Sequence, residues 1–314
     1  MPRPQRHDVL IAGAGPGGIA AAFCLRGFGL DALLLEAAMQ PGGQLHEIHA
    51  AVRDFPLAYG WDGRRLTGSL LADARAAEIP ILVGAPVRRL SVRGRWLERG
   101  EGRDAERFHA RAILIATGLT RRRLGVPGED ELAGRGVSVS ANRDRERFAG
   151  LPVAVVGGGT AAVEDALLCA DVGCDVTLLH RSTRFRARSD FLARLKAHPR
   201  IRVVTRAAVT KILGRDQVEG ISFRVGRTRA ERTVAVRGVF VRIGWDPCTE
   251  FLRGALRLDR DGYVRAGEGG RTSAPWVWAA GDVCSPRWPS IANAMGQGAA
   301  AGWDITRALG RLPR

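Results

Sequence analysis

The stretch GAGPGG at residues 13–18 decides the fold of the first part of the chain. A short apolar run, His7 to Ala12, precedes it and predicts a buried strand, and an alanine-rich helix is expected to follow to about Phe28. A second apolar strand, Ala32 to Leu35, ends in Glu36. A strand, a GxGxxG turn, a helix and a second strand ending in an acid are the parts of a Rossmann dinucleotide-binding unit.

Each glycine of this turn has its own physical task. Gly13 permits the tight turn, Gly15 lets a pyrophosphate approach the backbone, and Gly18 lets the helix pack closely on the strand. The helix N-terminus then directs unpaired N–H groups at the phosphates. Glu36 lies about 20 residues further on, where its carboxylate can accept hydrogen bonds from both ribose hydroxyls. We therefore expect a dinucleotide with an unphosphorylated ribose here.

The same pattern recurs in the middle of the chain. A strand expected at Val153 to Val156 leads into GGGTAA at residues 157–162, then a helix to about Val172 and a strand from Asp175 to Leu179. Alanine replaces the third glycine, which this fingerprint tolerates. The sequence therefore predicts a second dinucleotide site of the same construction.

The residue that corresponds to Glu36 in the second copy is His180, and Arg181 follows it. An acid would repel a 2′-phosphate, whereas a histidine beside Arg181, with Arg186 downstream, would attract one. The alternative is that both arginines are surface residues of a loop in an arginine-rich chain and bind no phosphate. We expect the second copy to bind NADPH.

Short β segments and a closing strand that ends in glycine follow each Rossmann half. The segments are expected at Ile79 to Val83, Val87 to Ser91, Arg95 to Glu98, Ile201 to Thr205, Ile221 to Val225 and Thr233 to Val236, and the closing strands at Ala112 to Gly118 and Gly238 to Gly244. A last strand, Trp276 to Ala280, and a small-residue helix from about Ser290 through Ala308 are expected to join the first domain, because the middle one is already complete.

We therefore expect an α/β fold with two Rossmann-like domains of the three-layer ββα type, one inserted into the other. The first domain comprises residues 1–120 and 246–314, and the second comprises residues 121–245. The two connectors, near Leu119–Arg123 and Gly244–Pro247, suit a hinge. A chain of 314 residues is long enough for two cores.

Composition and charge narrow the class of protein. The chain is 46% hydrophobic and 25% charged, and its net charge is +16, with all but two of its 48 basic residues being arginine. The arginines are scattered, which indicates a solvated basic surface; an acidic protein partner ranks next and nucleic acid last. We see no signal peptide and no apolar run that could span a membrane, so a cytoplasmic location is expected.

Further motifs occur in order along the chain. They are GGQL at residues 42–45, ATG at 116–118, LGVPGE at 124–129, GRGVS at 134–138, a GGGxxAxE stretch ending at Glu164, the pair at 180–181, and AGDV at 280–283. With these motifs the chain resembles the low-molecular-weight thioredoxin reductase family of FAD/NADPH flavoproteins over nearly its whole length. The resemblance implies that the first domain binds FAD, the second binds NADPH, and the protein is a homodimer.

The resemblance also assigns residues. Asp282 would hydrogen-bond the ribityl chain, and the N–H groups near Ser290 and Ile291 would face the pyrimidine edge of the flavin and stabilise its reduced anion. The expected FAD residues are Gly13, Gly15, Pro16, Gly17, Gly18, Glu36, Gly43, Gln44, Leu45, Thr117, Gly118, Gly281, Asp282, Ser290 and Ile291. The expected NADPH residues are Gly157, Gly159, Thr160, Ala161, Glu164, His180, Arg181, Arg186 and Gly244.

One departure from the family affects the chemistry. Reductases of this family carry a redox-active CxxC pair just before the Rossmann strand of the NADPH domain, followed by an aspartate. The matching positions here are Ser140 and Arg143, followed by Asp144. Neither serine nor arginine forms a disulfide, so thioredoxin reduction by the family's route is excluded on chemical grounds. Ser182 replaces another family arginine, which weakens the expected preference for NADPH.

Candidate catalytic residues remain few. Asp144 is a possible proton donor, although one charge in the solvated run 143–147 is the favoured interpretation. Cys284 is the best candidate thiol, although a buried structural cysteine is the favoured interpretation. His46 and His49 share a helical face if their segment is helical and are then possible acid or base groups, although exposed helix histidines are the favoured interpretation. The remaining candidate thiols, Cys169 and Cys174, are expected to face different directions. No metal site is expected.

The leading hypothesis is an NADPH-dependent FAD oxidoreductase without its own dithiol, which passes electrons to an external acceptor such as an acidic ferredoxin-like or flavodoxin-like protein. Ferredoxin–NADP reductases of the thioredoxin reductase-like type act in this way. The alternatives are a flavin-dependent oxidase or reductase of a small dithiol or disulfide, and a sensor that binds FAD and NADP(H) without turnover.

Overall fold

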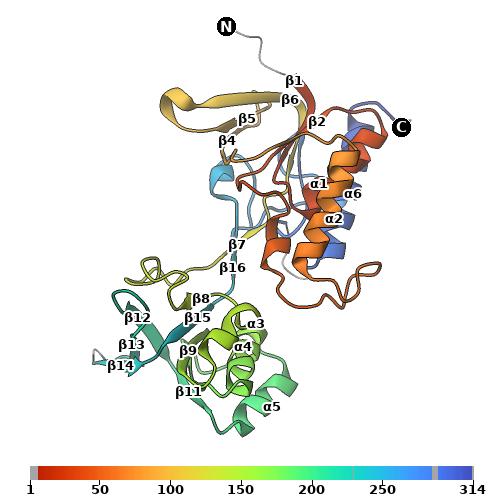
Figure 1. The fold of residues 1–314 in the computed structure, drawn as a ribbon. Coiled ribbons are helices and arrows are strands. Elements are labelled where there is room, and N and C mark those ends of the chain that lie inside the picture. The colour runs from red at the N-terminus through yellow and green to blue at the C-terminus, as the bar shows by residue number, and fades with distance from the viewer. Residues whose placement is uncertain (1–5, 229, 285–288, 313–314) are drawn as a thin grey trace. The chain divides into compact units, whose positions relative to one another are not determined.

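The structure, a computed structural model, describes residues 6–228, 230–284 and 289–312. The chain divides into two compact units. Unit 1 comprises Met1–Thr120 and Asp246–Arg314, and unit 2 comprises Arg121–Trp245. Each unit is an α/β body with a mainly parallel sheet at its centre (Figure 1).

The sheet of unit 1 has the order β3-β2-β1-β6-β5-β4, and β17 pairs with β6. Its strands are β1 (Arg6–Ala12), β2 (Ala32–Leu35), β3 (Ile81–Leu82), β4 (Val87–Ser91), β5 (Trp96–Arg99), β6 (Glu106–Ile115) and β17 (Val277–Ala279). The pairs among β1, β2, β3, β6 and β17 are parallel, whereas β4, β5 and β6 form an antiparallel meander.

Side chains of β1 alternate between two cores, as expected for a strand covered on both faces. Val9 and Ile11 pack with residues of the helices, whereas Leu10 and Ala12 pack with residues of the meander. The helices of unit 1 are α1 (Pro16–Gly27), η1 (Gly43–Glu47), α2 (Gly63–Ala76), η2 (Gly102–Asp104), η4 (Glu250–Leu252), η5 (Glu268–Gly270) and α6 (Ile291–Ala308). Helices, parallel sheet and meander therefore make three layers.

Helices α1 and α6 approach each other very closely because their contact is made of small residues. A Cβ atom on Gly298 would overlap the carbonyl oxygen of Gly17, and one on Gly302 would lie 3.0 Å from the carbonyl oxygen of Ala21. The C-terminal segment therefore completes unit 1 through α6 on α1 and through β17 beside β6.

Unit 2 repeats the three layers. Its parallel sheet has the order β11-β10-β9-β15-β8, formed by β8 (Val137–Ser138), β9 (Pro152–Gly157), β10 (Asp175–His180), β11 (Ile201–Thr205) and β15 (Gly238–Arg242). One face is covered by helices and the other by a meander. The remaining elements are α3 (Ala141–Asp144), η3 (Arg145–Phe148), α4 (Thr160–Asp171), α5 (Ser189–Ala197), β12 (Ala207–Leu213), β13 (Gly220–Val225) and β14 (Glu231–Ala235).

Two of the short β segments expected from sequence extend the parallel sheets. The segment at Ile201–Thr205 pairs with β10, and Ile81–Leu82 pairs with β2. The third meander strand of unit 2 is β12, which the sequence analysis missed. The two connecting segments, β7 (Leu119–Arg121) and β16 (Trp245–Pro247), pair as a separate two-stranded sheet.

Candidate functional site

The glycine turn of unit 1 is fixed by close backbone contacts. Gly13 has φ +106°, and a Cβ atom there would overlap the carbonyl oxygen of Ala116. A Cβ atom on Gly18 would overlap the carbonyl oxygen of Gly13. Helix α1 begins at Pro16 with Gly15 as its N-cap and no side-chain cap, so its first N–H groups are available to an anion.

Glu36 stands at the carboxyl end of β2 and is only 8% exposed. Its Oε2 accepts a hydrogen bond from the N–H of Ala14 at 2.8 Å, and its Oε1 accepts one from the N–H of Ala38 at 2.9 Å. The backbone therefore holds the carboxylate beside the glycine turn. Each oxygen keeps acceptor capacity for a hydroxyl group.

Asp282 provides an unsatisfied buried acceptor in unit 1. Its Oδ2 accepts a hydrogen bond from Nε2 of Gln44 at 3.3 Å, while its Oδ1 is buried with no hydrogen-bond partner among the described residues. Burial raises the pKa of this carboxyl, and the hydrogen bond from Gln44 partly offsets that rise. An unpaired buried oxygen costs free energy unless a ligand donates to it, which a hydroxylated chain can do.

Short contacts connect these segments. A Cβ atom on Gly17 would lie 3.7 Å from the Cα atom of Gly281, and one on Gly15 would lie 3.9 Å from that of Gly43. A Cβ atom on Gly118 would lie 3.5 Å from Nε2 of Gln44. The structure thus brings together four segments of unit 1: the glycine turn, η1, the segment after β6 that contains Gly118, and the segment after β17 that contains Gly281.

The other predicted FAD residues lie around this group. Thr117 donates its hydroxyl to the carbonyl oxygen of Cys248 at 2.8 Å. Ser290 is the N-cap of α6 and accepts a hydrogen bond from the N–H of Asn293 at 3.2 Å. Leu45 and Ile291, the first residue of α6, pack in one small apolar cluster. The start of α6 therefore faces the same part of unit 1 as η1.

The glycine turn of unit 2 has the same construction. A Cβ atom on Gly157 would overlap the carbonyl oxygen of Arg242, whereas one on Gly159 would meet no atom within 4 Å. Gly159 is the N-cap of α4, which begins at Thr160 without a side-chain cap. The following loop is attached to this turn, because the N–H of Arg186 donates to the carbonyl oxygen of Gly158 at 2.8 Å.

His180 lies against the glycine turn and is only 8% exposed. Its Nε2 lies 2.8 Å from the hydroxyl of Ser182 and 3.0 Å from the carbonyl oxygen of Arg184, and its ring lies 4.6 Å from that of Phe185. A Cβ atom on Gly158 would overlap the imidazole. His180 therefore organises the loop and supports the turn, which its position in the sequence alone did not indicate.

The remaining predicted NADPH residues surround this turn. Arg181 and Arg186 are both exposed on the loop after β10, and Ala161 is exposed at the start of α4. Glu164 is half-buried on α4. Gly244, with φ +104°, follows β15, and its carbonyl oxygen accepts a hydrogen bond from the N–H of Arg122 at 3.0 Å. The loop thus presents two guanidinium groups beside a free helix N-terminus, a combination suited to phosphate.

Comparison with known proteins agrees with this construction. The family model described as pyridine nucleotide-disulphide oxidoreductase matches residues 7–298. The chain belongs to this family. It is 36% identical to the thioredoxin reductase of Mycolicibacterium smegmatis over 96% of both chains.

Solved structures of the family match nearly the whole chain. The thioredoxin reductase of Lactococcus lactis superposes with a TM-score of 0.80 at 28% identity, covering 98% of this chain and all of that one. The thioredoxin reductase of T. acidophilum gives a TM-score of 0.77 at 30% identity, covering 97% of this chain and 99% of that one. The α/β fold with Rossmann-like domains expected from the sequence is therefore confirmed, and this chain is a thioredoxin reductase-like member of the oxidoreductase family.

Asp144 of this oxidoreductase is not the solvated charge that the sequence favoured. It is 6% exposed, accepts a hydrogen bond from the hydroxyl of Ser138 at 2.6 Å, and pairs with the guanidinium of Arg143 at 2.8 Å. Burial alone would raise the pKa of Asp144, but the hydrogen bonds and the positive charges of Arg143 and Arg147 lower it below its usual value. Asp144 is therefore an ionised anchor and a poor proton donor at neutral pH.

A buried ion pair between Asp165 and Arg242 contacts the backbone of the segment before Asp144. Nε of Arg242 lies 3.1 Å from Oδ2 of Asp165, and the same oxygen accepts a hydrogen bond from the N–H of Ala141. Another nitrogen of Arg242 donates to the carbonyl oxygen of Val139 at 2.8 Å. Burial raises the pKa of Asp165 to about 6, against the opposing charge of Arg242. Sequence patterns gave no sign of this pair, because its members are far apart in the chain.

The other two catalytic candidates show no activation. Burial, followed by the charge of Asp282, raises the pKa of Cys284 to about 12, so this thiol stays protonated. His46 is exposed, and its Nε2 lies 2.9 Å from the carbonyl oxygen of Pro41. Helix η1 ends at Glu47, so the condition under which His46 and His49 would share a helical face is not met.

Cys169 and Cys174 do not face different directions, and this prediction is wrong. Their thiols hydrogen-bond to each other, and Sγ of Cys174 also donates to the carbonyl oxygen of Phe148 at 3.0 Å. The chain reverses after α4 because Gly173 has φ +85°, and the N–H of Cys174 then donates to the carbonyl oxygen of Cys169. Unit 1 ends α1 in the same way, with Leu25 and Leu30 at the two positions.

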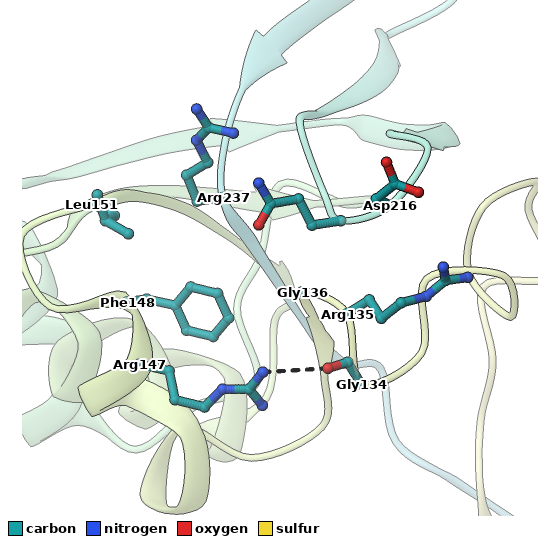
Figure 2. A pocket seen from close by; sticks show the side chains of 9 residues that line it. Gly134, Arg135, Gly136, Arg147, Phe148, Leu151, Asp216 and Arg237 are labelled. Atoms are coloured by element: carbon teal, nitrogen blue, oxygen red, sulfur yellow. Dashed lines mark hydrogen bonds between the residues drawn. The ribbon is translucent and has the colours of Figure 1, made fainter.

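A pocket of about 540 Å³ lies elsewhere in unit 2, and no predicted dinucleotide residue lines it. Figure 2 shows Arg147 directed at the carbonyl oxygen of Gly134, while Arg135 and Arg237 extend away from each other. The other lining residues are Gly136, Phe148, Leu151, Asp216 and Gln217. Because these guanidinium groups point in different directions, they do not form a single anion-binding site.

In the ranges 6–228, 230–284 and 289–312, no helix is long and apolar enough to cross a membrane. Within the same ranges, His, Cys, Asp and Glu side chains form no group of three or more that could hold a metal ion.

Proposed function

We propose that this chain is an NADPH-dependent FAD oxidoreductase that passes hydride from NADPH to FAD and electrons onward to an external acceptor, without a dithiol of its own. The observation that carries the proposal is the buried Oδ1 of Asp282, which has no donor among the described residues and lies near a glycine turn whose helix N-terminus is open. A flavin dinucleotide supplies both a ribityl hydroxyl and a pyrophosphate. The residues therefore fit FAD.

In this proposal each part of unit 1 has a binding task. Glu36 accepts the adenosine ribose hydroxyls, and the N–H groups after Pro16 receive the pyrophosphate. Asp282 accepts a hydrogen bond from a ribityl hydroxyl, and the amide of Gln44 holds the Asp282 carboxylate in place. The N-terminus of α6, capped by Ser290, places partial positive charge near the flavin ring. The bound cofactor supplies the hydride acceptor, and these residues position it.

The proposed NADPH site lies in unit 2. The open N-terminus of α4 receives the pyrophosphate, and Arg181 with Arg186 receives the 2′-phosphate. Ser182 occupies the position of a family arginine and is engaged with His180, so it adds no charge there. We therefore propose a preference for NADPH over NADH that rests on two arginines.

The absence of a dithiol follows from the sequence at the family's redox position. Ser140 and Arg143 occupy the two positions, and none of the five cysteines is spaced as CxxC. Arg143 is held by Asp144, and the N–H of Ala141 is held by Asp165. This segment is therefore built as a fixed, charged turn. We propose direct transfer of electrons from flavin to acceptor, with an acidic iron–sulfur or flavin protein as the acceptor class.

Two alternatives make different predictions. A flavin-dependent oxidase or reductase of a small dithiol or disulfide would use a thiol, for which Cys284 is the remaining candidate near Asp282. A sensor would bind FAD and NADP(H) without turnover. The raised pKa of Cys284 favours direct transfer over the thiol route.

Stopped-flow absorbance tests the proposal. Purified protein should be yellow, and anaerobic NADPH should bleach its flavin band within the turnover time, whereas a sensor would bleach slowly or not at all. Turnover with ferricyanide should be unchanged in Cys284→Ser. Colourless protein that takes up no FAD would exclude the proposal. Light scattering would test the homodimer that the family resemblance implies.

A further inference from the structure

The loop between η1 and α2 is closed at its neck. The N–H of Val52 donates to the carbonyl oxygen of Trp61 at 2.8 Å, and the N–H of Gly60 donates to the carbonyl oxygen of Val52 at 2.8 Å. Val52 and Ala58 are buried in a small apolar cluster that Leu45 of η1 and Leu66 of α2 share. A compact loop whose ends are joined and whose side chains are packed is an Ω-loop, a class that often carries binding function.

The tip of this loop exposes two large apolar side chains. Leu57 is 99% exposed and Tyr59 is 69% exposed. The backbone of Leu57 has φ +70°, a left-handed conformation that leucine rarely adopts. A left-handed backbone at Leu57 costs free energy, and its exposed side chain returns no free energy of burial to the fold. Such outliers are associated with binding sites, where the strain presents a side chain to a partner.

We propose that the loop 52–61 is the docking surface for the protein that accepts electrons from this enzyme, with Leu57 and Tyr59 as its apolar anchors. The proposal rests on the proposed function and names the face that the acceptor uses. The partner is an acidic iron–sulfur protein with an apolar pocket for the two side chains.

Charge around the loop selects an acidic partner. Arg53, Arg64 and Arg65 are exposed at its base, and the guanidinium of Arg65 lies 4.0 Å from the ring centroid of Trp61. Of the two nearby acids, Asp54 is exposed, and Asp62 accepts a hydrogen bond from the N–H of Arg65 as the N-cap of α2. The net charge of +16 adds a long-range attraction for an acidic protein.

The loop is continuous with the proposed flavin site. Helix η1, directly before it, carries Gln44, whose amide donates to Asp282. Leu45 and Ile291, at the two elements proposed to border the flavin, pack in the same cluster as Val52 and Ala58. A protein seated on the loop would therefore lie beside the proposed flavin site of unit 1.

The test compares protein and small-molecule acceptors. The variant Leu57→Gly removes the side chain and suits the left-handed backbone, and it is combined with Tyr59→Ser; Val203→Ser, an exposed apolar residue of unit 2, is the control. The acceptors are an acidic [2Fe–2S] ferredoxin and ferricyanide. We expect the double variant to raise the KM for ferredoxin at least tenfold, with ferricyanide turnover within twofold of wild type.

Other outcomes would overturn the proposal. The proposal fails if the double variant has an unchanged KM for ferredoxin, or if it loses as much turnover with ferricyanide as with ferredoxin. It also fails if wild type neither binds nor reduces ferredoxin. Dissociation of a dimer by the double variant in light scattering would assign the loop to a second copy instead. Failure of the proposed function is distinguishable, because wild type would then not oxidise NADPH even with ferricyanide. Calorimetric titration with oxidised ferredoxin would still test docking.

Discussion

Asp165 and Arg242 form a buried ion pair in which a single carboxylate oxygen, Oδ2, is both 3.1 Å from a guanidinium nitrogen and bonded to the N–H of Ala141. The other oxygen, Oδ1, is buried without a partner among the described residues. The pair thus connects α4 and β15 to the segment before Asp144, and burial raises the pKa of Asp165 so that its protonation depends on pH near neutrality.

The pH dependence of stability should reveal Asp165. Burial raises the pKa of Asp165 to about 6 in the folded state, above the value of 3.8 for an unperturbed carboxyl. The folded protein therefore binds this proton more tightly than the unfolded chain does, and the contribution to stability rises as pH falls from 7 toward 4. Urea unfolding should show wild type gaining on the order of 1 kcal/mol relative to Asp165→Asn between pH 7 and pH 5. A constant or opposite difference would contradict this assignment.

Removing the carboxylate altogether should be more costly. Asp165→Ala leaves the N–H of Ala141 and the largely buried guanidinium of Arg242 without their acceptor, and a buried donor left unsatisfied typically costs about 1–3 kcal/mol. The control is Asp175→Ala, which breaks the exposed pair with Arg200 at 3.0 Å and should cost about 0–1 kcal/mol. Chemical denaturation measures both. Equal losses in the two variants would mean that the buried pair has no special structural role.

Flavin retention should depend on two carboxylates of unit 1. Glu36→Ala and Asp282→Ala should each raise the Kd for FAD roughly tenfold to hundredfold, because hydrogen bonds to a charged group contribute about 1.5–3 kcal/mol. The ratio of flavin to protein absorbance after purification, followed by fluorescence titration, gives the values. Glu78→Ala, which breaks an exposed pair with Arg26, is the control and should retain full flavin.

Selection of NADPH should depend on two arginines of unit 2. Arg181→Ala and Arg186→Ala should each raise the KM for NADPH about tenfold and leave the KM for NADH nearly unchanged, since only the 2′-phosphate contact is lost. Steady-state oxidation with ferricyanide measures both constants. The neighbouring Arg188→Ala is the control, because that guanidinium is already paired with Asp190 at 2.7 Å. Parallel losses with both nucleotides would place the arginines outside the 2′-phosphate site.

The thiol pair at the end of α4 should prove structural. Cys169→Ala combined with Cys174→Ala should leave NADPH–ferricyanide turnover within twofold and lower stability by about 1–2 kcal/mol, the cost of lost side-chain volume in a tight turn. The corresponding contact in unit 1 is made by Leu25 and Leu30, which carry no thiol. If turnover fell strongly while the flavin content stayed normal, we would instead infer that the two thiols take part in electron transfer.

Local patterns made the dinucleotide framework predictable. The turn at residues 13–18 needs Gly13 at positive φ and the carboxylate of Glu36 at the end of the next strand, and both requirements are visible as residue types at fixed spacing. The same holds for the turn at residues 157–162. Strand β2 was predicted with its observed bounds, Ala32–Leu35, because every residue in it is buried and apolar.

Contacts between distant segments were not predictable in this way. The expectation for Asp144 failed because its neighbours in sequence are charged, while its burial comes from packing of the segment and from Ser138. The expectation for Cys169 and Cys174 failed because helical spacing was extended past Gly173, where the chain turns back. Strand β12 was missed because its exposed and buried residues give no strong alternation.

The order of the segments along the chain has a consequence for synthesis on the ribosome. Unit 2 is one continuous stretch, so all of its strands have been synthesised once residue 245 has been made. Unit 1 still lacks β17 and α6 at that time, and its glycine turn lacks the helix that packs against Gly17. The inserted unit can therefore fold first, while the enclosing one lacks its last strand and helix, and is exposed to chaperones and proteases, until residues 277–308 have followed.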